Sequence, residues 1–239
     1  MGSFEEIAAE SQQRWEELTA GGQPWIRIGT ALCGKAAGCD DVIEAIEAAL
    51  QQNGVAAQVS QVGCLGLCFA EPLVDVQLPG GPRVFYGNVT PETAAEIVAN
   101  HVAGGAPLSH LALGYLAAGG SDGTVNSALD GIPDLNQHPM RVVENRVVLR
   151  NAGTIDPEDI HQYIANDGYH ALNQALTEMS PEEVLEQVNT SGLRGRGGAA
   201  FSTGTKWRFL AGSNAPQKYI LCNCEEGDPG AFNDKAILE

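Results

Sequence analysis

Four of the six cysteines lie close together in the first third of the chain, at spacings that suit metal binding. Five residues separate Cys33 from Cys39, and three separate Cys64 from Cys68. In a reducing compartment a close-set cysteine group binds metal more often than it forms disulfides. Zinc ribbons usually contain Cys-x2-Cys knuckles, which neither pair forms. Four thiolates on two glycine-flanked loops instead suit a [2Fe–2S] cluster, whose two irons each take two sulfurs.

A glycine-rich stretch from Ser191 to Trp207 is the second group of residues that could do chemistry. Within seven residues it contains Gly192, Gly195, Gly197 and Gly198. Glycine at this density lets the backbone bring N–H groups close to a bound anion. Arg194, Arg196 and Lys206 add positive charge nearby. The pattern is typical of a phosphate-binding loop, although such loops are often only turns.

An apolar run from Lys218 to Cys222 follows, and it ends in a group of polar residues. These are Asn223, Glu225, Glu226 and Asp228, before a Pro-Gly turn. In open α/β sheets, nucleotides bind where strand ends deliver polar groups into a crevice. We therefore expect a strand at 218–222, with Cys222 buried on it, and a nucleotide site beside its end.

The first hundred residues carry the periodicity of a small domain that would position the cysteines. Ser3 and Glu6 form a capping-box pattern that predicts a helix from Ser3 to Ala20. The pattern then predicts a strand at 25–28, a helix at 40–52, a strand at 55–62, a hairpin of 73–78 with 83–86, and a helix at 90–101. This βαβ–ββα order is that of a thioredoxin-like domain, with cysteines on the loops after both early strands.

The second half of the chain reads as a linker followed by part of another α/β domain. Glycine and proline clusters, including Gly119–Gly123, predict a linker up to His138, with a helical turn or two at 109–118. Short strands are predicted at 140–143 and 146–150, and helices at 157–168, 169–176 and 180–192. The expected domains are an N-terminal helix at 1–24, a thioredoxin-like domain at 25–104, a linker at 105–138 and an α/β segment at 139–239.

The composition is that of a globular chain with a strong negative charge. The net charge is −17 at pH 7, and 44% of the residues are hydrophobic. Such a charge argues against nucleic acid as a partner, because phosphates would be repelled. No apolar run approaches the roughly 18 residues that a membrane span needs, and the N-terminus lacks a signal-peptide pattern. We therefore expect a cytoplasmic protein that does not insert into membranes.

The glycine-rich stretch and the Cys222–Phe232 segment together resemble the flavoprotein subunit of the complex I NADH module. Diaphorase-type subunits of NAD-dependent hydrogenases and formate dehydrogenases share the pattern. The family has Gly-Leu-Arg-Gly-Arg-Gly-Gly-Ala-Gly-Phe-Pro-Thr-Gly-x-Lys-Trp, against Gly-Leu-Arg-Gly-Arg-Gly-Gly-Ala-Ala-Phe-Ser-Thr-Gly-Thr-Lys-Trp here. Later it has Cys-Asn-Ala-Asp-Glu-Gly-Asp-Pro-Gly-Ala-Phe, against Cys-Asn-Cys-Glu-Glu-Gly-Asp-Pro-Gly-Ala-Phe. Two blocks in the same order make chance agreement improbable.

The resemblance implies FMN as cofactor and NAD(H) as hydride donor or acceptor, with no side chain acting as a catalytic group. Carried over by position, the flavin and its phosphate side would contact Gly195, Arg196 and Gly197. Lys206 would place a cation near the flavin, and the groups that would hydrogen-bond it are Asn223, Glu225 and Glu226. The residues facing the dinucleotide would be Phe201, Phe209 and Asp228.

This chain departs from the flavoprotein pattern at four positions. Ala200 replaces a glycine where a nucleotide approaches, Ser202 replaces a proline, and Glu225 replaces an aspartate. Cys224 replaces an alanine beside the flavin site, either as an inert small residue or as a thiol that tunes the flavin.

The segment Gly63-Cys-Leu-Gly-Leu-Cys-Phe-Ala-Glu-Pro-Leu-Val resembles the thioredoxin-fold [2Fe–2S] ferredoxins. The resemblance makes Cys64 and Cys68 cluster ligands and matches Cys33 to the second ligand. The first ligand would fall near Ile28, where there is no cysteine. Two interpretations stay open: Cys39 replaces the missing ligand, or Cys39 is a buried helix-start residue in a domain without a cluster. We take Cys33, Cys39, Cys64 and Cys68 as the candidate set.

The flavoprotein family continues for hundreds of residues beyond the segment that corresponds to the end of this chain. We therefore expect a partial flavin site that another chain or segment completes. The leading interpretation is an electron-transfer subunit, or part of one, that passes electrons between NAD(H), FMN and a [2Fe–2S] cluster. Its partners would be the other subunits of a multi-subunit redox complex. The alternatives are a non-catalytic docking subunit with a degenerate flavin site and a stand-alone ferredoxin-like carrier.

Overall fold

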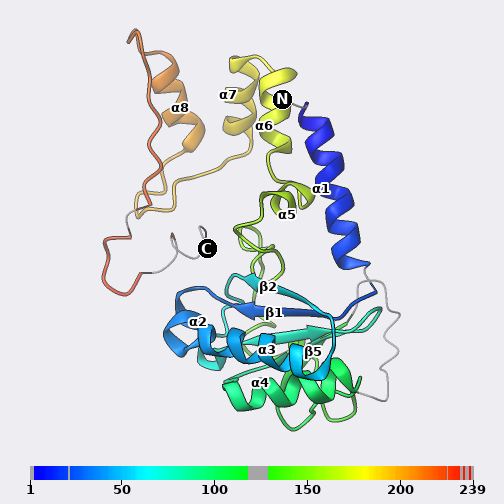
Figure 1. Ribbon diagram of the computed structural model, residues 1–239. Coiled ribbons are helices and arrows are strands. Elements are labelled where there is room, and N and C mark those ends of the chain that lie inside the picture. The colour runs from blue at the N-terminus through cyan, green and yellow to red at the C-terminus, as the bar shows by residue number, and fades with distance from the viewer. Residues whose placement is uncertain are drawn as a thin grey trace. The chain divides into compact units, whose positions relative to one another are not determined.

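The computed structural model describes residues 3–20, 22–117, 129–224, 226–231, 234 and 237. The chain divides into two compact units (Figure 1). The first contains Met1–Asn166 and Glu226–Glu239, and the second contains Asp167–Glu225. The glycine-rich segment Gly119–Gly123 lies outside the described residues.

A five-stranded mixed sheet forms the centre of the first unit, with strand order β2-β1-β3-β4-β5. The strands are β1 (Trp25–Gly29), β2 (Gln58–Val62), β3 (Val74–Gln77), β4 (Arg83–Tyr86) and β5 (Ala112–Leu116). β1 and β2 pair in parallel, whereas the pairs β1–β3, β3–β4 and β4–β5 are antiparallel. With α3 (Cys39–Asn53) between β1 and β2 and α4 (Pro91–Ile97) after β4, this is the thioredoxin-like topology that the sequence predicts. The α/β fold class is confirmed, with β5 added at one edge.

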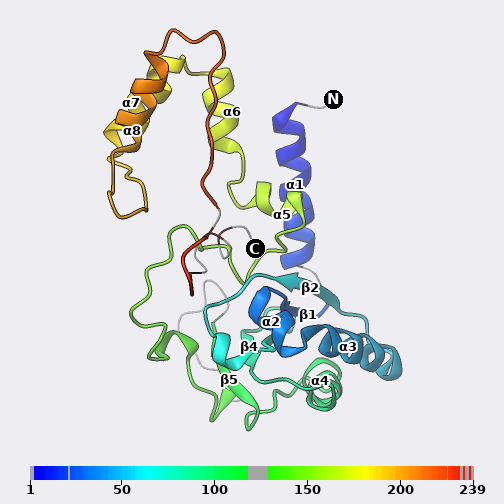
Figure 2. The same cartoon turned by 90° about the vertical axis from the view of Figure 1, so that its left-hand side faces the viewer.

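Helices α3 and α4 cover one face of this sheet (Figure 2). Val42, Ile46 and Ala49 recur at helical spacing on α3 and pack with Ile26 and Ile28 of β1 in the main core. Gly54 ends α3 in a left-handed conformation, φ +63°, which a glycine adopts at little cost. A capping box begins α4, which continues into the π-helical segment Val98–Ala103.

The opposite face of the sheet carries a second core, built mainly from the loop that follows β2. Its buried side chains are Leu65, Leu67, Ala70, Leu73, Phe85 and Leu135. The last of these begins the 3₁₀ turn Leu135–Gln137, in the segment expected to be a linker. The cysteine-bearing loop is thus anchored by its own leucines, which point into the protein between the thiols.

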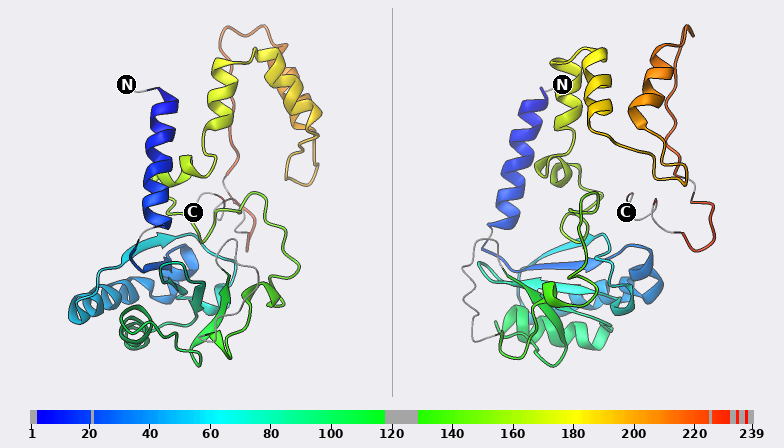
Figure 3. Two further views of the ribbon diagram at one scale, coloured as in Figure 1. Left: turned by 90° about the vertical axis from the view of Figure 1, so that its right-hand side faces the viewer. Right: turned by 180° about the vertical axis from the view of Figure 1, so that it is seen from behind.

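The N-terminal helix α1 (Phe4–Thr19) packs against α5 (Ile160–Ala165), within the first unit (Figure 3). Ser3 and Glu6 form the capping box that the sequence predicts. Ser11 of α1 is buried, and its hydroxyl lies 2.9 Å from Nδ1 of His161 on α5. This hydrogen bond links the N-terminal helix to a helix that follows it by about 150 residues.

Three local predictions were wrong. Residues 112–116 form strand β5 rather than helical turns, because the edge of β4 offers a row of backbone groups for pairing. The segments 140–143 and 146–150 are turns, and their valines are largely exposed. Residues 218–222 are also extended chain without strand pairing among the described residues, and Cys222 is exposed rather than buried. Apolar β-branched runs need a neighbouring strand to become strands themselves.

The second unit consists of three short helices and the loops between them. They are α6 (His170–Thr177), α7 (Pro181–Thr190) and α8 (Thr203–Ala211). The predicted capping box of Ser180 and Glu183 begins α7. Gly204 of α8 lies against the backbone of Asn189 on α7, where a Cβ would come within 2.5 Å of Asn189 Cα. None of the described helices in either unit is long and apolar enough to cross a membrane.

A buried ionic network ties together three strands of the sheet. Asp75 on β3 accepts from Arg27 of β1 at 2.5 Å and from Arg83 of β4 at 2.6 Å. Arg27 also lies over the Trp25 ring, 3.5 Å from its centroid. Burial lowers the pKa of Arg27 to about 10, and the Asp75 carboxylate opposes that shift. Asp75 is therefore the counter-charge that allows Arg27 to be buried and Arg83 to be partly buried here.

Replacing Asp75 by Ala is expected to lower the free energy of unfolding by about 3–5 kcal/mol, because Arg27 would stay buried without a counter-charge. Urea denaturation followed by circular dichroism measures the change. Glu10→Ala is the matched control: it breaks the exposed pair with Arg14 and should cost at most about 1 kcal/mol. Equal effects of the two substitutions would contradict the assigned role of Asp75.

A buried histidine makes the stability of the first unit depend on pH. The Tyr86 hydroxyl accepts from the Leu108 N–H at 3.2 Å and makes a hydrogen bond of 2.9 Å with Nδ1 of His101. Burial lowers the pKa of His101 to about 4. The folded state therefore holds a neutral imidazole where the unfolded chain binds a proton below about pH 6.5. This contribution to stability is complete above pH 6.5 and is lost as the pH falls toward 4.

The stability advantage of the wild type over His101→Gln should therefore shrink by about 3 kcal/mol between pH 7 and pH 4. Urea denaturation of both proteins at several pH values measures this difference, and the other titrating groups cancel between them. Parallel stability curves for the two proteins would show that His101 is not buried as a neutral imidazole.

Candidate cofactor sites

The two cysteine-bearing loops meet at one edge of the sheet because they follow parallel neighbours. β1 and β2 pair in the register Gly29 to Val62, and the pairing continues as Thr30 N–H donates to Val62 O at 3.0 Å. The carboxyl ends of parallel strands lie at the same edge, so the chain leaves both strands in the same place. Cys33 follows β1 on the short helix α2 (Leu32–Ala37), and Cys64 follows β2.

Three thiols converge at this edge. The sulfurs of Cys64 and Cys68 lie 3.8 Å apart, and the Cys33 thiol is within hydrogen-bonding reach of Cys68. The backbone N–H of Gly66 donates to Cys64 Sγ at 3.2 Å, from a φ of +80° that favours glycine. Desolvation raises the pKa values of Cys64 and Cys68, and the Gly66 N–H partly opposes this at Cys64. The three sulfurs therefore lie close together at the edge of the sheet where β1 and β2 end.

Cys39, the fourth candidate ligand, does not join the other three. Its side chain is fully buried at the start of α3, in the main core with Val42 and Ile46. The Cys39 thiol lies 3.9 Å from the carboxylate of the adjacent Asp40. Burial also raises the Cys39 pKa. Its position in the core makes Cys39 a packing residue in this structure.

A buried acid that the sequence analysis did not single out lies near two of the thiols, Cys64 and Cys68. Glu71 is 7% exposed, and its Oε2 accepts from the Leu73 N–H at 2.8 Å. Desolvation raises the Glu71 pKa, and interactions with Leu73 and with the Cys64 thiol oppose that shift. The sequence contains a feature that points to Glu71, because it is the only charged residue in an otherwise apolar run from Leu65 to Val74. Lone acids in apolar surroundings often mark functional sites.

The donor set at this edge fits a two-iron cluster in part. Among the described residues, no group of three or more His, Cys, Asp or Glu side chains is placed to hold a metal ion. A [2Fe–2S] cluster makes a different demand, because its ligands are divided between two irons. Cys33, Cys64 and Cys68 lie close together, and the Gly66 N–H donates to Cys64, so these three residues could supply three of the four ligands. Within the first unit, the remaining cysteine, Cys39, is in the core and does not supply a fourth thiolate.

The glycine-rich stretch forms an exposed loop between α7 and α8. Backbone hydrogen bonds close it, from Gly195 N–H to Phe201 O at 2.8 Å and from Thr203 N–H to Leu193 O at 3.0 Å. Gly195, Arg196 and Gly197 are all exposed on it. Adding a Cβ at Gly197 would meet nothing within 4 Å. The loop leaves backbone and arginine side chains accessible, as an anion-binding loop requires.

Helix α8 begins directly after this loop and presents the aromatic and cationic candidates. Ser202 caps it by accepting from the Thr205 N–H at 3.3 Å. The rings of Phe201 and Phe209 lie 6.5 Å apart and are both exposed. Lys206 is exposed on the same helix. The structure thus brings the loop, two aromatic rings and a cation together within the second unit.

The remaining candidates lie on irregular chain. Asn223 is exposed near the end of the second unit, whereas Glu226 and Asp228 belong to the first unit. Glu226 has a φ of +50° and accepts from the Asp234 N–H at 2.9 Å. Glu225 lies outside the described residues, and Cys222 and Cys224 are exposed.

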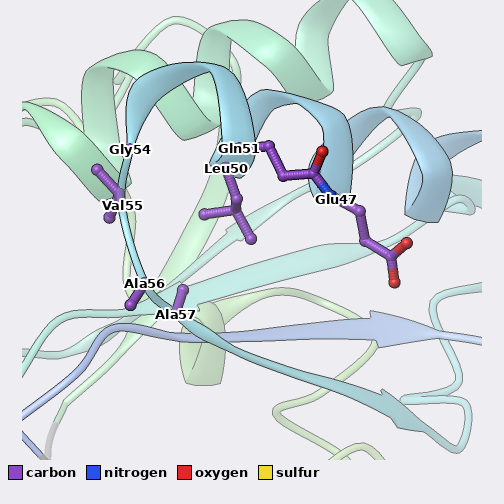
Figure 4. Close-up of a pocket in the computed structure, with 7 residues that line it drawn as sticks. All are labelled: Glu47, Leu50, Gln51, Gly54, Val55, Ala56 and Ala57. Carbon is purple, nitrogen blue, oxygen red and sulfur yellow. The ribbon is translucent and has the colours of Figure 1, made fainter.

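Two hollows in the structure are lined by residues other than these candidates. An open apolar groove of about 660 Å³ lies among α6, α7 and α8. Its lining includes Leu176, Leu185, Trp207, Leu210 and Ile220. A second hollow of about 480 Å³ lies where α3 ends and the chain turns toward β2 (Figure 4). Its lining residues, Glu47 to Ala57, include none of the candidate site residues.

Comparison with known proteins assigns the C-terminal segment. Residues 188–239 match the Nuo51 FMN-binding domain family. The NADP-reducing hydrogenase protein HndC of Solidesulfovibrio fructosivorans is 55% identical over 94 residues, which are 39% of this chain and 19% of that protein. An NADH-quinone oxidoreductase subunit of Rhizobium meliloti is 47% identical over 93 residues, 39% of this chain and 22% of that protein. The corresponding subunit of Escherichia coli is 40% identical over 84 residues, 35% and 19% of the two chains.

These matches confirm the resemblance to the flavoprotein subunit that the two sequence blocks predict. The chain spans about a fifth of the length of these curated relatives. A solved structure, the thioredoxin-like [2Fe–2S] ferredoxin of Aquifex aeolicus, is 25% identical to this chain. The similarity covers 42% of this chain and 99% of the ferredoxin, with a TM-score of 0.36.

The glycine loop contains one strained residue that leads to a test of its geometry. Ala200, where the flavoprotein pattern has glycine, adopts a φ of +44° and donates its N–H to Gly197 O at 3.0 Å. A left-handed conformation disfavours a Cβ, so Ala200→Gly should stabilise the closed loop by about 1 kcal/mol. Hydrogen–deuterium exchange of peptides over 193–203 should then slow by about fivefold. Ala199→Gly, at a negative φ, is the control and should leave exchange equal or faster; slowing in both variants would contradict the assigned strain.

Proposed function

We propose that this chain is an electron-transfer subunit, or part of one, of an NADH-linked oxidoreductase that uses FMN and a [2Fe–2S] cluster. The observation that carries the proposal is the match of residues 188–239 to the Nuo51 FMN-binding domain. That segment contains the whole glycine-rich loop and helix α8. Subunits of an NADP-reducing hydrogenase and of NADH-quinone oxidoreductases are among the relatives.

The chain's contribution to the flavin site would come from the second unit and the residues just after it. Gly195 and Gly197 would let the FMN phosphate side approach the backbone, and Arg196 would pair with its charge. Lys206 would add a cation near the flavin. Hydrogen bonds to the flavin would come from Asn223, Glu225 and Glu226. FMN exchanges a hydride with NAD(H) and single electrons with iron–sulfur centres.

The dinucleotide would bind against the aromatic side of α8. The exposed rings of Phe201 and Phe209 offer faces on which an adenine can stack. Asp228 would face the NADH. The site needs further contacts, because the relatives are about five times as long as the part of them that this chain covers. We therefore propose that other subunits or segments of a multi-subunit complex complete it.

The thioredoxin-like unit would hold the cluster at the edge where β1 and β2 end. Cys33, Cys64 and Cys68 would bind it, with the Gly66 N–H donating to a ligand sulfur. Hydrogen bonds to ligand sulfurs are among the factors that set the potential of such clusters. Leu65 and Leu67 of the same loop are buried, so they would exclude water from the side of the cluster that faces the protein core.

A second candidate function is a non-catalytic docking subunit. The burial of Cys39 favours it, because a set of four thiolates is not assembled among the described residues. In this alternative the thioredoxin-like unit serves only as a binding surface, and the flavin segment is a remnant.

Iron, sulfide and flavin, assayed on the same anaerobically purified sample, separate the two functions. We expect roughly two irons and two sulfides per chain after reconstitution. FMN should be retained in equal amount only when partner chains are present. Cys64→Ser should lose most of the iron, whereas Cys222→Ser, at an exposed cysteine of the second unit, should keep it.

The flavin assignment has its own matched pair of variants. Arg196→Ala should weaken FMN retention in the assembled complex, whereas Arg14→Ala, on α1, should leave it unchanged. Absence of iron after reconstitution would favour the docking subunit. Absence of FMN from a complex that contains iron would overturn the flavin half of the proposal alone.

A further inference from the structure

We propose that the Glu71 carboxylate, and not Cys39, completes the cluster's ligand set together with Cys33, Cys64 and Cys68. The inference rests on the proposed function, in which a [2Fe–2S] cluster binds at this edge. It deepens that function by assigning the fourth ligand to an oxygen donor from the loop after β2.

The first argument is the place that the carboxylate occupies. A Cβ built on Gly29, the last residue of β1, would lie 2.9 Å from Glu71 Oε2 and 3.0 Å from Oε1. A Cβ on Gly34 would lie 3.3 Å from Oε2. Thus the Glu71 carboxylate fills the space that a side chain at the end of β1 would need. The first ligand of the ferredoxin pattern would fall near this strand end, at about Ile28, where this sequence has no cysteine.

The second argument is the state of the carboxylate oxygens. Oε2 accepts from the Leu73 N–H, whereas Oε1 is buried without a hydrogen bond of good geometry among the described residues. The Cys64 thiol lies close enough to interact with the carboxylate. Buried polar atoms are almost always satisfied, and a buried carboxylate without a partner is costly. An iron bound by the adjacent thiolates would give Oε1 the positively charged partner that it lacks.

The third argument is that the carboxylate is held in place without any cluster. Leu73 donates its N–H to Glu71 and accepts from the Gly29 N–H at 2.9 Å. The same residue therefore ties the carboxylate to the end of β1. A ligand fixed in this way loses little conformational freedom when metal binds.

Cys39 would have to leave the core to take this role. Its side chain is 0% exposed and packs in the main core on α3. Turning it toward the loops would leave a cavity beside Val42 and Ile46, and core cavities are destabilising. Iron accepts carboxylate as well as thiolate ligands, so the chemistry does not require a fourth sulfur.

The test compares reconstituted full-length variants by iron and sulfide content, visible absorption and electron paramagnetic resonance after reduction. Cys39→Ala should load a cluster like the wild type, with an unchanged spectrum. Glu71→Gln, which is isosteric but uncharged, should lose cluster loading or retention against a chelator by about tenfold or more. Glu71→Cys should bind a cluster whose absorption and g values differ from those of the wild type, because all four ligands become sulfur.

Asp40→Asn is the matched control, since it removes a carboxylate next to Cys39 and should change neither loading nor spectrum. Circular dichroism shows which variants fold; if Glu71→Gln does not, the spectra of Glu71→Cys and Cys39→Ala decide. Loss of the cluster in Cys39→Ala, or identical spectra for Glu71→Cys and the wild type, would overturn the inference while leaving the proposed function intact. A wild type that takes up no iron would overturn both.

Discussion

The parallel pairing of β1 with β2 is the constraint on which the thioredoxin-like unit depends. It brings the loops after both strands to one edge, so residues 33 and 64 become neighbours although they are distant in sequence. The leucines that alternate with the thiols enter the core on the opposite face of the sheet from α3 and α4. With this anchoring, Cys68 is exposed, and Cys33 and Cys64 are partly exposed. A cofactor site can therefore exist here without a deep cavity.

The two buried carboxylates of this domain, Asp75 and Glu71, differ in how far the protein itself neutralises their charge. The interior of the sheet buries Asp75 between two arginines, so that each charge has a partner in the protein. Glu71, a few residues away in sequence, is buried with one oxygen left without a comparable partner among the described residues. Within one small domain, the first arrangement serves stability, and the second leaves capacity to bind a cation. The contrast separates a structural charge from a candidate ligand.

In the second unit, unlike at the cysteine site, the candidate residues are mostly exposed. The glycine loop is closed by its own backbone hydrogen bonds. The aromatic rings of Phe201 and Phe209 and the side chain of Lys206 are exposed at α8. Such a surface holds the shape of a binding loop but buries little by itself. This fits a segment that contributes one wall of a flavin site, since the relatives that it matches are about five times longer than the matched part.

The sequence by itself determined the features that depend on local pattern. Capping boxes at Ser3 and Ser180, the helical spacing on α3 and the βαβ–ββα order were all predictable, because each arises from interactions within a few residues. The glycine loop likewise indicated the resemblance to the flavoprotein subunit, and the cysteine spacing indicated a set of four thiols, of which three converge. Only the tertiary structure decided that 112–116 pairs with β4, that Cys39 enters the core, and that Glu71 lies over Gly29. These outcomes depend on which distant surfaces meet, and the spacing of residues along a chain does not encode that directly.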